Sequence, residues 1–176
     1  MRKIVLYIAA SIDNFIAKKD GNVDWLDDPD YAIEGNDLGY SAFYQSLDTT
    51  FMGNATYQEV LGFDVPFPYP DKKNYVFSRS EKENDENVEF VSGDIVAFTK
   101  QLKAQSGKNI WLVGGGQINT LFLEKGLIDQ IILTIIPITL GDGISMFQKG
   151  SVETKFVLEK SEAFQNGMVQ LTFNKK

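Results

Sequence analysis

The sequence of 176 residues predicts an α/β fold with a mixed, mostly parallel central sheet that ends in an antiparallel hairpin. Residues 3–10 (KIVLYIAA) and 130–137 (QIILTIIP) are apolar on both faces, which is typical of strands inside a covered sheet. Between them, strand-like runs alternate with helix-like runs. Near the end, residues 155–164 and 168–176 are joined by Gln165-Asn166-Gly167, a hairpin pattern. No linker or repeat interrupts this order, so we expect one domain spanning residues 1–176.

The first half of the chain begins with the strand 3–10 and continues into a long irregular segment with a turn signal at Asp20-Gly21. Segments of about 15 residues or more without regular structure are usually functional or disordered, and the apolar residues here favour function. Asn36 or Asp37 is expected to cap a helix that runs to about Leu47. A short strand (DTTFMG) and a helix (NATYQEVL) follow, joined at Gly53.

The second half contains a proline-rich surface loop at residues 62–73, strands at 74–78 and 88–91, and a helix capped by Asp94. The next strand runs into Gly114-Gly115-Gly116 and then into a helix that Gly126 ends. A glycine triplet between a strand and a helix brings free N–H groups and a helix dipole together, which suits a phosphate. The alternative is a tight turn with close packing. A second glycine-to-helix junction occurs at Gly53, where Asn54 or Thr56 could cap the helix or bind an anion.

Composition excludes several classes of chemistry. The chain has no cysteine and no histidine, which removes thiol nucleophiles, Ser-His-Asp triads and the usual zinc sites, so we expect no metal. Such an enzyme works with carboxylates, hydroxyls and backbone dipoles, or with an organic cofactor. The net charge of −7 argues against nucleic acid as a partner. No run of about 18 apolar residues occurs, so we expect no membrane association and a cytoplasmic location.

Two common nucleotide-binding patterns are absent. A Rossmann domain places GxGxxG after the first strand, but this first strand ends in Ala-Ala-Ser and the glycines come two-thirds of the way along the chain. A Walker loop, GxxxxGK[ST], does not occur either. A phosphate site at the triplet would therefore belong to another fold.

Six motifs in order carry a resemblance to a known family: a first strand ending in Ala-Ser, SIDNFIA with DGNVDW, FMGNATY, VFSRS, VGGGQI and PITLGDGISMF. Together they resemble the dihydrofolate reductase fold, a three-layer α/β/α architecture. The greatest similarity is to the branch containing the C-terminal reductase domain of bifunctional riboflavin-biosynthesis proteins. The resemblance covers nearly the whole chain.

The resemblance implies an NADPH-dependent reductase, with NADH possible, whose cofactor lies along the C-terminal ends of the central strands. It implies a cis peptide between Gly114 and Gly115. It also implies contacts at the nicotinamide, along the adenosine half and at the two helix starts that flank the pyrophosphate. The nicotinamide would contact Ala10 and Ile16, and the adenosine half would contact Ser78, Arg79 and Ser80. The first helix start consists of Gly53, Asn54, Ala55 and Thr56, and the second of Val113, Gly114, Gly115, Gly116, Gln117 and Ile118.

The proton donor implied by the resemblance is Asp37, on the first helix. The alternative interpretation of Asp37 is a helix cap, and Asp13 and Asp24 are other nearby acids. A carboxylic acid or an ordered water would be enough to protonate the acceptor nitrogen. Trp25 is expected to line the substrate pocket, whereas Trp111, Tyr57, Phe77, Phe122 and Phe147 are expected in the core.

Three departures from the family pattern bear on specificity. Asn54 replaces an arginine that grips the adenosine 2′-phosphate, so preference for NADPH is expected to depend on Arg79 alone. Lys72 replaces an arginine that pairs with the tail of folate, and lysine lacks its bidentate geometry. Asn119 replaces an aromatic residue beside the nicotinamide.

These departures favour a small heterocycle other than folate, such as a ribosylamino-pyrimidine. The alternative function is a non-catalytic nucleotide-binding or dimerisation module that keeps the fold. A homodimer is expected in either case, through the C-terminal hairpin and the PITLGDG loop.

Overall fold

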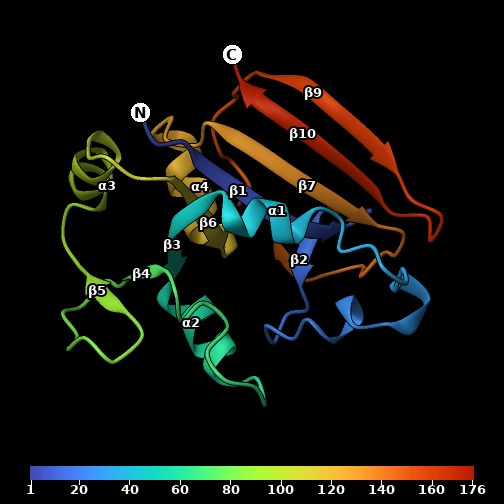
Figure 1. The fold of residues 1–176 in the computed structure, drawn as a ribbon, viewed down its shortest axis with the longest axis horizontal. Helices are drawn as coiled ribbons and strands as arrows, with labels where there is room; N and C mark the ends of the chain where they lie inside the picture. The colour runs from blue at the N-terminus through green and yellow to red at the C-terminus, as the bar shows by residue number, and fades with distance from the viewer.

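The computed structural model describes residues 1–176 and is built around an eight-stranded sheet in the order β5-β4-β3-β6-β1-β7-β10-β9 (Figure 1). A second sheet pairs β2 with β8. The strands are β1 (Ile4–Ser11), β2 (Phe15–Ala17), β3 (Leu47–Gly53), β4 (Lys73–Phe77), β5 (Glu89–Val91), β6 (Asn109–Gly114), β7 (Gln130–Ile136), β8 (Ile144–Ser145), β9 (Phe156–Ala163) and β10 (Val169–Lys175). The α-helices are α1 (Tyr40–Gln45), α2 (Asn54–Leu61), α3 (Ile95–Ala104) and α4 (Gly116–Glu124).

The main sheet is mixed, as the sequence predicts. Strands β5, β4, β3, β6, β1 and β7 are parallel, and β10 and β9 add the antiparallel hairpin at one edge. The register places Met52 opposite Gly114 and Gly53 opposite Phe77. The C-terminal ends of β3, β4 and β6 therefore meet at one edge of the sheet, which is where ligands bind in open α/β sheets.

Helices cover both faces of the sheet, which gives the three-layer arrangement. Successive side chains of β1 alternate between faces, so Ile4 and Leu6 pack into one core cluster and Val5 into the other. The first cluster includes Leu102 of α3 and Phe122 of α4, and the second includes residues of α1 and α2. Figure 1 shows α1 crossing in front of the sheet and α4 behind it.

The first helix is shorter than the sequence predicts. It begins at Tyr40 because Leu38 and Gly39 adopt φ values of 55° and 79°, which are incompatible with a helix, and it ends before Leu47. Leu47 is already paired with Asn109 in the sheet. The predicted cap at Asp94 is confirmed, since its side chain accepts a hydrogen bond from the N–H of Ala97 at 2.9 Å.

The irregular segment after β1 is ordered by contacts with the chain around β8. Strand β2 pairs antiparallel with β8, and two short 3₁₀ turns, Asp24–Leu26 and Pro29–Tyr31, follow it. Asp13 accepts hydrogen bonds from the Ser11 hydroxyl at 2.6 Å and from the N–H groups of Leu140 and Gly141 at 3.1 and 2.7 Å. These bonds hold the pKa of Asp13 below its usual value, the Ser11 bond contributing most.

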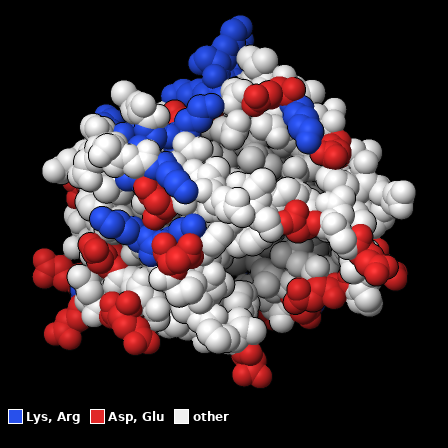
Figure 2. Space-filling view, in the orientation of Figure 1, with Lys and Arg blue, Asp and Glu red and all other residues white.

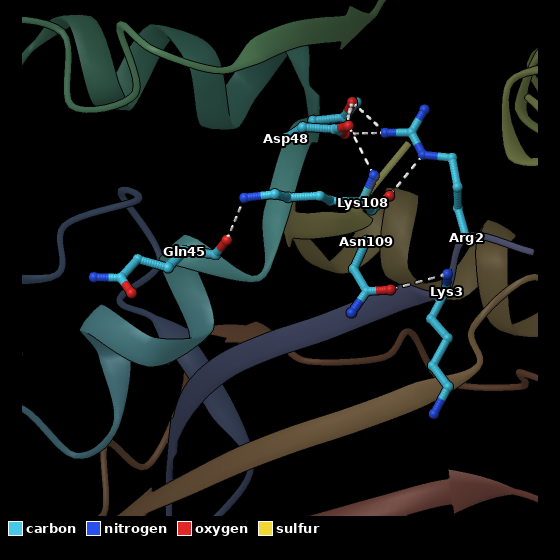
Figure 3. A network of polar contacts seen from close by, with 7 residues as sticks. Arg2, Lys3, Gln45, Asp48, Lys108 and Asn109 are labelled. Carbon is cyan, nitrogen blue, oxygen red and sulfur yellow. Dashed lines mark hydrogen bonds and ion pairs between the residues drawn. The ribbon is translucent and has the colours of Figure 1, made fainter. Parts of the chain in front are cut away.

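A polar network lies at the opposite, N-terminal edge of the sheet (Figure 3). Arg2 is 6% exposed and pairs with Asp48, while its Nε donates to the Lys108 carbonyl at 2.7 Å. Asp48 also accepts from the Lys108 N–H at 2.8 Å and from the Thr49 hydroxyl at 2.8 Å. This N-terminal-edge network of Arg2, Asp48, Thr49 and Lys108 ties together the beginnings of β1, β3 and β6.

None of the helices is both long enough and apolar enough to cross a lipid bilayer.

Candidate active site

A cavity of about 1200 Å³ opens at the C-terminal edge of the parallel strands. Its walls come from the ends of β1, β4 and β6, the first turns of α2 and α4, and the segment after β2. Figure 2 shows a hollow near the middle of this face, walled mainly by uncharged side chains and bordered by acidic ones. The chain thus brings its two glycine-to-helix junctions into one concavity, which is the usual form of a small-molecule site.

Most residues expected at a cofactor line this cavity. They lie within or just beyond the C-terminal part of a strand, or in the first turn of a helix. They are Ile16, Gly53, Asn54, Ala55, Thr56, Ser78, Arg79, Ser80, Val113, Gly115, Gly116, Gln117 and Ile118. The core predictions are confirmed for Tyr57, Phe77, Phe122 and Trp111, which are 7% exposed or less. Phe147 is half-buried and packs against the first core cluster.

Four expected residues do not line the cavity. Ala10 is 1% exposed, and the preceding residues of β1, Ile8 and Ala9, line the cavity instead. Gly114 is buried behind Gly115. Trp25 is 6% exposed and packs with Ile136 and Met168 in a separate core cluster. Asp37 is the fourth expected residue that does not line the cavity.

Asp37 lies at the start of α1, where it accepts hydrogen bonds from the N–H groups of Gly39 and Ser41 at 3.0 and 2.8 Å. Bonds from the side chain and the N–H of Ser41 hold the pKa of this exposed carboxyl below its usual value. The group is therefore ionised near neutral pH and has no proton to give. The geometry fits the cap interpretation of Asp37.

Replacing Asp37 with asparagine tests this placement. We expect an unchanged affinity for NADPH and an unchanged turnover, because Asp37 does not line the cavity. The loss of stability should be small, below about 1 kcal/mol, since asparagine caps helices as well as aspartate does. Thermal unfolding and cofactor titration measure these quantities. A large loss of turnover with normal cofactor binding would instead assign the proton transfer to Asp37.

The two helix starts differ in why they need glycine. A Cβ on Gly116 would lie 2.2 Å from the carbonyl oxygen of Ser145, so close packing alone requires glycine there. A Cβ on Gly53 would meet nothing closer than Ile118 at 3.8 Å, and its φ of −76° suits any residue. Nothing in the protein therefore requires glycine at position 53. The free space beside the first turn of α2 fits a ligand that approaches the backbone.

The peptide bond between Gly114 and Gly115 is cis, as the family resemblance implies. Gly115 is the N-cap of α4, and Gly53 is the N-cap of α2. Neither helix start has a side-chain cap, so their first N–H groups are free to bind an anion.

Five aromatic residues that the sequence did not single out for the cavity also line it: Tyr7, Phe63, Tyr69, Phe77 and Trp111. The Tyr7 ring stacks on Phe43 with centroids 4.3 Å apart, and the Trp111 Nε1 donates to the Tyr7 carbonyl at 3.0 Å. Burial raises the pKa of the Tyr7 hydroxyl, and the nearby charge of Asp37 adds to this, so the hydroxyl keeps its proton. No local sequence signal distinguishes these aromatic residues from core residues, because all but Phe63 pack in or against the core and also line the cavity.

Two residues discussed for specificity face away from the cavity. The Lys72 side chain is 8% exposed, pairs with Asp71 at 2.9 Å, and lies 4.0 Å above the Tyr44 ring. Asn119 is fully buried and its Nδ2 donates to the Met146 carbonyl at 3.1 Å. Neither is placed to contact a ligand in the cavity.

Comparison with known proteins agrees with this geometry. Residues 70–170 match the model of the family described as the RibD C-terminal domain. Two uncharacterized proteins of Bacillus subtilis (strain 168) are similar over almost their whole length. YwjB is 45% identical over 93% of this chain and 92% of its own, and YyaP is 32% identical over 98% and 95%.

Solved structures show the same architecture. A candidate riboflavin biosynthesis protein from Shewanella sp. PV-4 is 33% identical with a TM-score of 0.88, covering 100% of this chain and 99% of its own. A deaminase/5-amino-6-(5-phosphoribosylamino)uracil reductase from Thermotoga maritima has a TM-score of 0.72 at 16% identity, covering 99% and 57%. Dihydrofolate reductase from Enterococcus faecalis, complexed with NADP(H), has a TM-score of 0.72 at 15% identity, covering 99% and 96%. The chain therefore belongs to the RibD C-terminal domain family and has the dihydrofolate reductase-like fold.

Proposed function

We propose that the protein is an NAD(P)H-dependent reductase of a pteridine-like or diaminopyrimidine heterocycle. The family and the fold support a reductase-type function in general. The observation that carries the finer proposal is the pair of uncapped helix starts, at Gly53 and Gly115, that open into one cavity.

The residues of the cavity fit a dinucleotide. The free N–H groups at the starts of α2 and α4 would bind the pyrophosphate, and the open space beside Gly53 would let it approach the backbone. The family resemblance gives the direction of the dinucleotide, and the sheet order places β4 to one side of these helices and β1 to the other. Ser78, Arg79 and Ser80 follow β4 and would hold the adenosine half. Ala9 and Ile16 would lie beside the nicotinamide, which supplies the hydride when bound.

The remaining walls favour a flat, uncharged substrate ring. Tyr7, Tyr69 and Trp111 offer aromatic surface and two hydroxyl groups near the β1 side of the cavity. The three carboxyl groups in the lining, Asp20, Glu59 and Glu124, all belong to exposed residues. A proton for the acceptor nitrogen would therefore come from the solvent side of the site. Because Lys72 is turned away, the cavity has no counterpart at that position for the carboxylates of folate.

Titration with NADPH tests the proposal, with tryptophan fluorescence as the signal. Trp111 lines the cavity whereas Trp25 does not, so Trp111→Phe should abolish the quenching and Trp25→Phe should preserve it. Absence of both quenching and a thermal shift at millimolar NADPH and NADH would overturn the proposal. If the cofactor binds, its oxidation with 5-amino-6-(5-phosphoribosylamino)uracil is compared with its oxidation by dihydrofolate. We expect turnover with the pyrimidine.

Replacing Gly53 with alanine separates ligand contact from packing. We expect the melting temperature to change by less than about 2 °C, because the added methyl group meets only ordinary van der Waals contacts. The Kd for NADPH should rise about tenfold, since the methyl group would occupy the space beside the helix start. Isothermal titration calorimetry measures the affinity. An unchanged Kd would show that the cofactor does not approach Gly53.

The homodimer remains a proposal. Every residue of β9 after Phe156 is exposed, including Val157 and Leu158 at 52% each, and its outer edge is unpaired. Such an edge is commonly covered by a partner. Light scattering that gives the mass of a monomer would contradict this assembly.

A further inference from the structure

We propose that the substrate end of the cavity selects an uncharged heterocycle that carries no phosphate. This inference rests on the function proposed above and narrows its substrate class, since the pyrimidine compared there is phosphorylated. The substrate end consists of Tyr7, Tyr69 and Trp111 with the cavity-lining residues of the last turn of α2 and of segment 19–26. This segment lies over the end of β1, because Leu26 and Ala9 pack against the same core cluster.

Aromatic rings and an unpaired hydroxyl group form the inner wall of the substrate end. The Trp111 ring meets the Tyr69 ring edge-on, with centroids 5.1 Å apart, and the Tyr7 ring edge-on at 6.2 Å. Tyr69 is 8% exposed, yet its hydroxyl has no hydrogen-bond partner in the protein, and its oxygen is not fully enclosed. Buried polar groups are nearly always paired, so this hydroxyl is suited to a polar atom of a ligand. Burial raises the pKa of Tyr69, so the hydroxyl stays protonated and can donate to a neutral ring.

The rim of the substrate end is negatively charged. Glu59, in the last turn of α2, reaches the segment after β2, since a Cβ on Gly21 would lie 2.7 Å from its Oε1. Asp20 is next to Gly21 in the chain and also lines the cavity. The ion pairs of the protein include neither carboxylate. The C-terminal end of α2, which is the negative end of its dipole, adds to the charge of this rim.

The cations that line the cavity do not offset this charge. Lys19 is the cation of the substrate end, and it is already paired with Asp142 at 2.6 Å. Arg79 and Lys82 follow β4, on the other side of the helix starts, where the Lys82 Nζ donates to the Asn54 Oδ1 at 2.7 Å. A phosphate at the substrate end would therefore face like charges without a free cation, and its binding would be opposed.

Calorimetry with a matched pair of ligands tests this inference. The probes are 5-amino-6-(ribosylamino)uracil and its 5′-phosphate, which differ only in the phosphate, and the protein is saturated with NADP⁺ so that no turnover occurs. We expect the phosphorylated probe to have a Kd about tenfold higher, because the rim repels it. The difference should shrink in about 1 M salt, since screening weakens the interaction between exposed charges.

Substitutions assign the difference to particular groups. Glu59→Gln should lower the Kd of the phosphorylated probe about threefold and leave that of the unphosphorylated probe within about a factor of two. Glu34→Gln is the matched control, because it removes an exposed carboxylate that does not line the cavity, and it should change neither Kd. Tyr69→Phe should raise the Kd of both probes about fivefold through the lost hydrogen bond and leave the Kd for NADP⁺ unchanged.

The outcomes separate this inference from the function on which it rests. If the protein binds neither NADPH nor NADP⁺, the reductase proposal fails and this inference fails with it. If the cofactor binds but the phosphorylated probe binds as tightly as the unphosphorylated one, or neither probe binds, only the inference is overturned. A preference that neither Glu59→Gln nor salt reduces would also overturn it, because the charge of the rim would not be its source.

Discussion

Gly116→Ala is expected to lower the melting temperature by about 6–12 °C, corresponding to a loss of about 3 kcal/mol in the free energy of unfolding. The added Cβ would lie 2.2 Å from the backbone oxygen of Ser145, which has no flexible side chain that could move away. Either α4 or β8 has to shift. Differential scanning calorimetry measures the effect.

The consequences extend beyond stability, because α4 is fixed to this segment by further bonds. The Thr120 hydroxyl donates to the Gly116 carbonyl at 2.7 Å and accepts from the Gln148 N–H at 2.8 Å. Displacement at Gly116 would therefore move the first turn of α4, which lines the cavity, and under the proposed function we expect loss of NADPH binding. Gly53→Ala is the matched control, with the same added methyl group and no clash. Equal melting temperatures for the two variants would contradict the packing argument.

Asp48→Ala is expected to reduce the free energy of unfolding by about 2–4 kcal/mol. The substitution leaves the Arg2 guanidinium, whose side chain is 5% exposed, without its carboxylate partner. It also removes the acceptor for the Lys108 N–H. Urea denaturation measures the loss. Lys19→Ala is the control, since it breaks an ion pair whose side chains are 73% and 63% exposed and should cost less than about 1 kcal/mol.

The effect of Asp48→Ala should depend on pH. Burial tends to raise the pKa of Asp48, but the Lys108 N–H, the Thr49 hydroxyl and the charge of Arg2 outweigh it, and the pKa lies below its usual value. A carboxyl with a lowered pKa in the folded state stabilises the protein above its unfolded pKa of about 3.9 and loses that contribution as the pH falls. The difference between wild type and variant should shrink below about pH 4. A difference that stays constant down to pH 3 would exclude ionisation of Asp48 as its source.

The sequence predicts the strands and the two helix starts well, because hydrophobic patterns and glycine positions are local signals. It predicts a contact at Ala10, whereas Ile8 and Ala9 line the cavity, because a resemblance aligned by motifs does not determine how far along β1 the cavity extends. It predicts too long a first helix, because the positive φ values at Leu38 and Gly39 depend on the chain that follows β2. The contact between Lys82 and Asn54 spans 28 residues, and no periodicity or motif reports such a contact.

Asp37 and Trp25 show a different limit. The sequence indicates that a carboxyl group precedes a helix, and a helix cap is by itself a sufficient explanation of that pattern. Whether the same carboxyl also faces a cavity depends on the angle at which the helix meets the sheet. Similarly, Trp25 is apolar enough for either a pocket or a core, and its burial against Ile136 and Met168 results from the path of the irregular segment.

The N-terminal-edge network and the cavity lie at opposite ends of the same three strands, β1, β3 and β6. This separation places the ion pair that holds the sheet together far from the residues that line the cavity. Residues that line the cavity, such as Asn54, can therefore be exchanged without disturbing the ion pair that anchors the sheet.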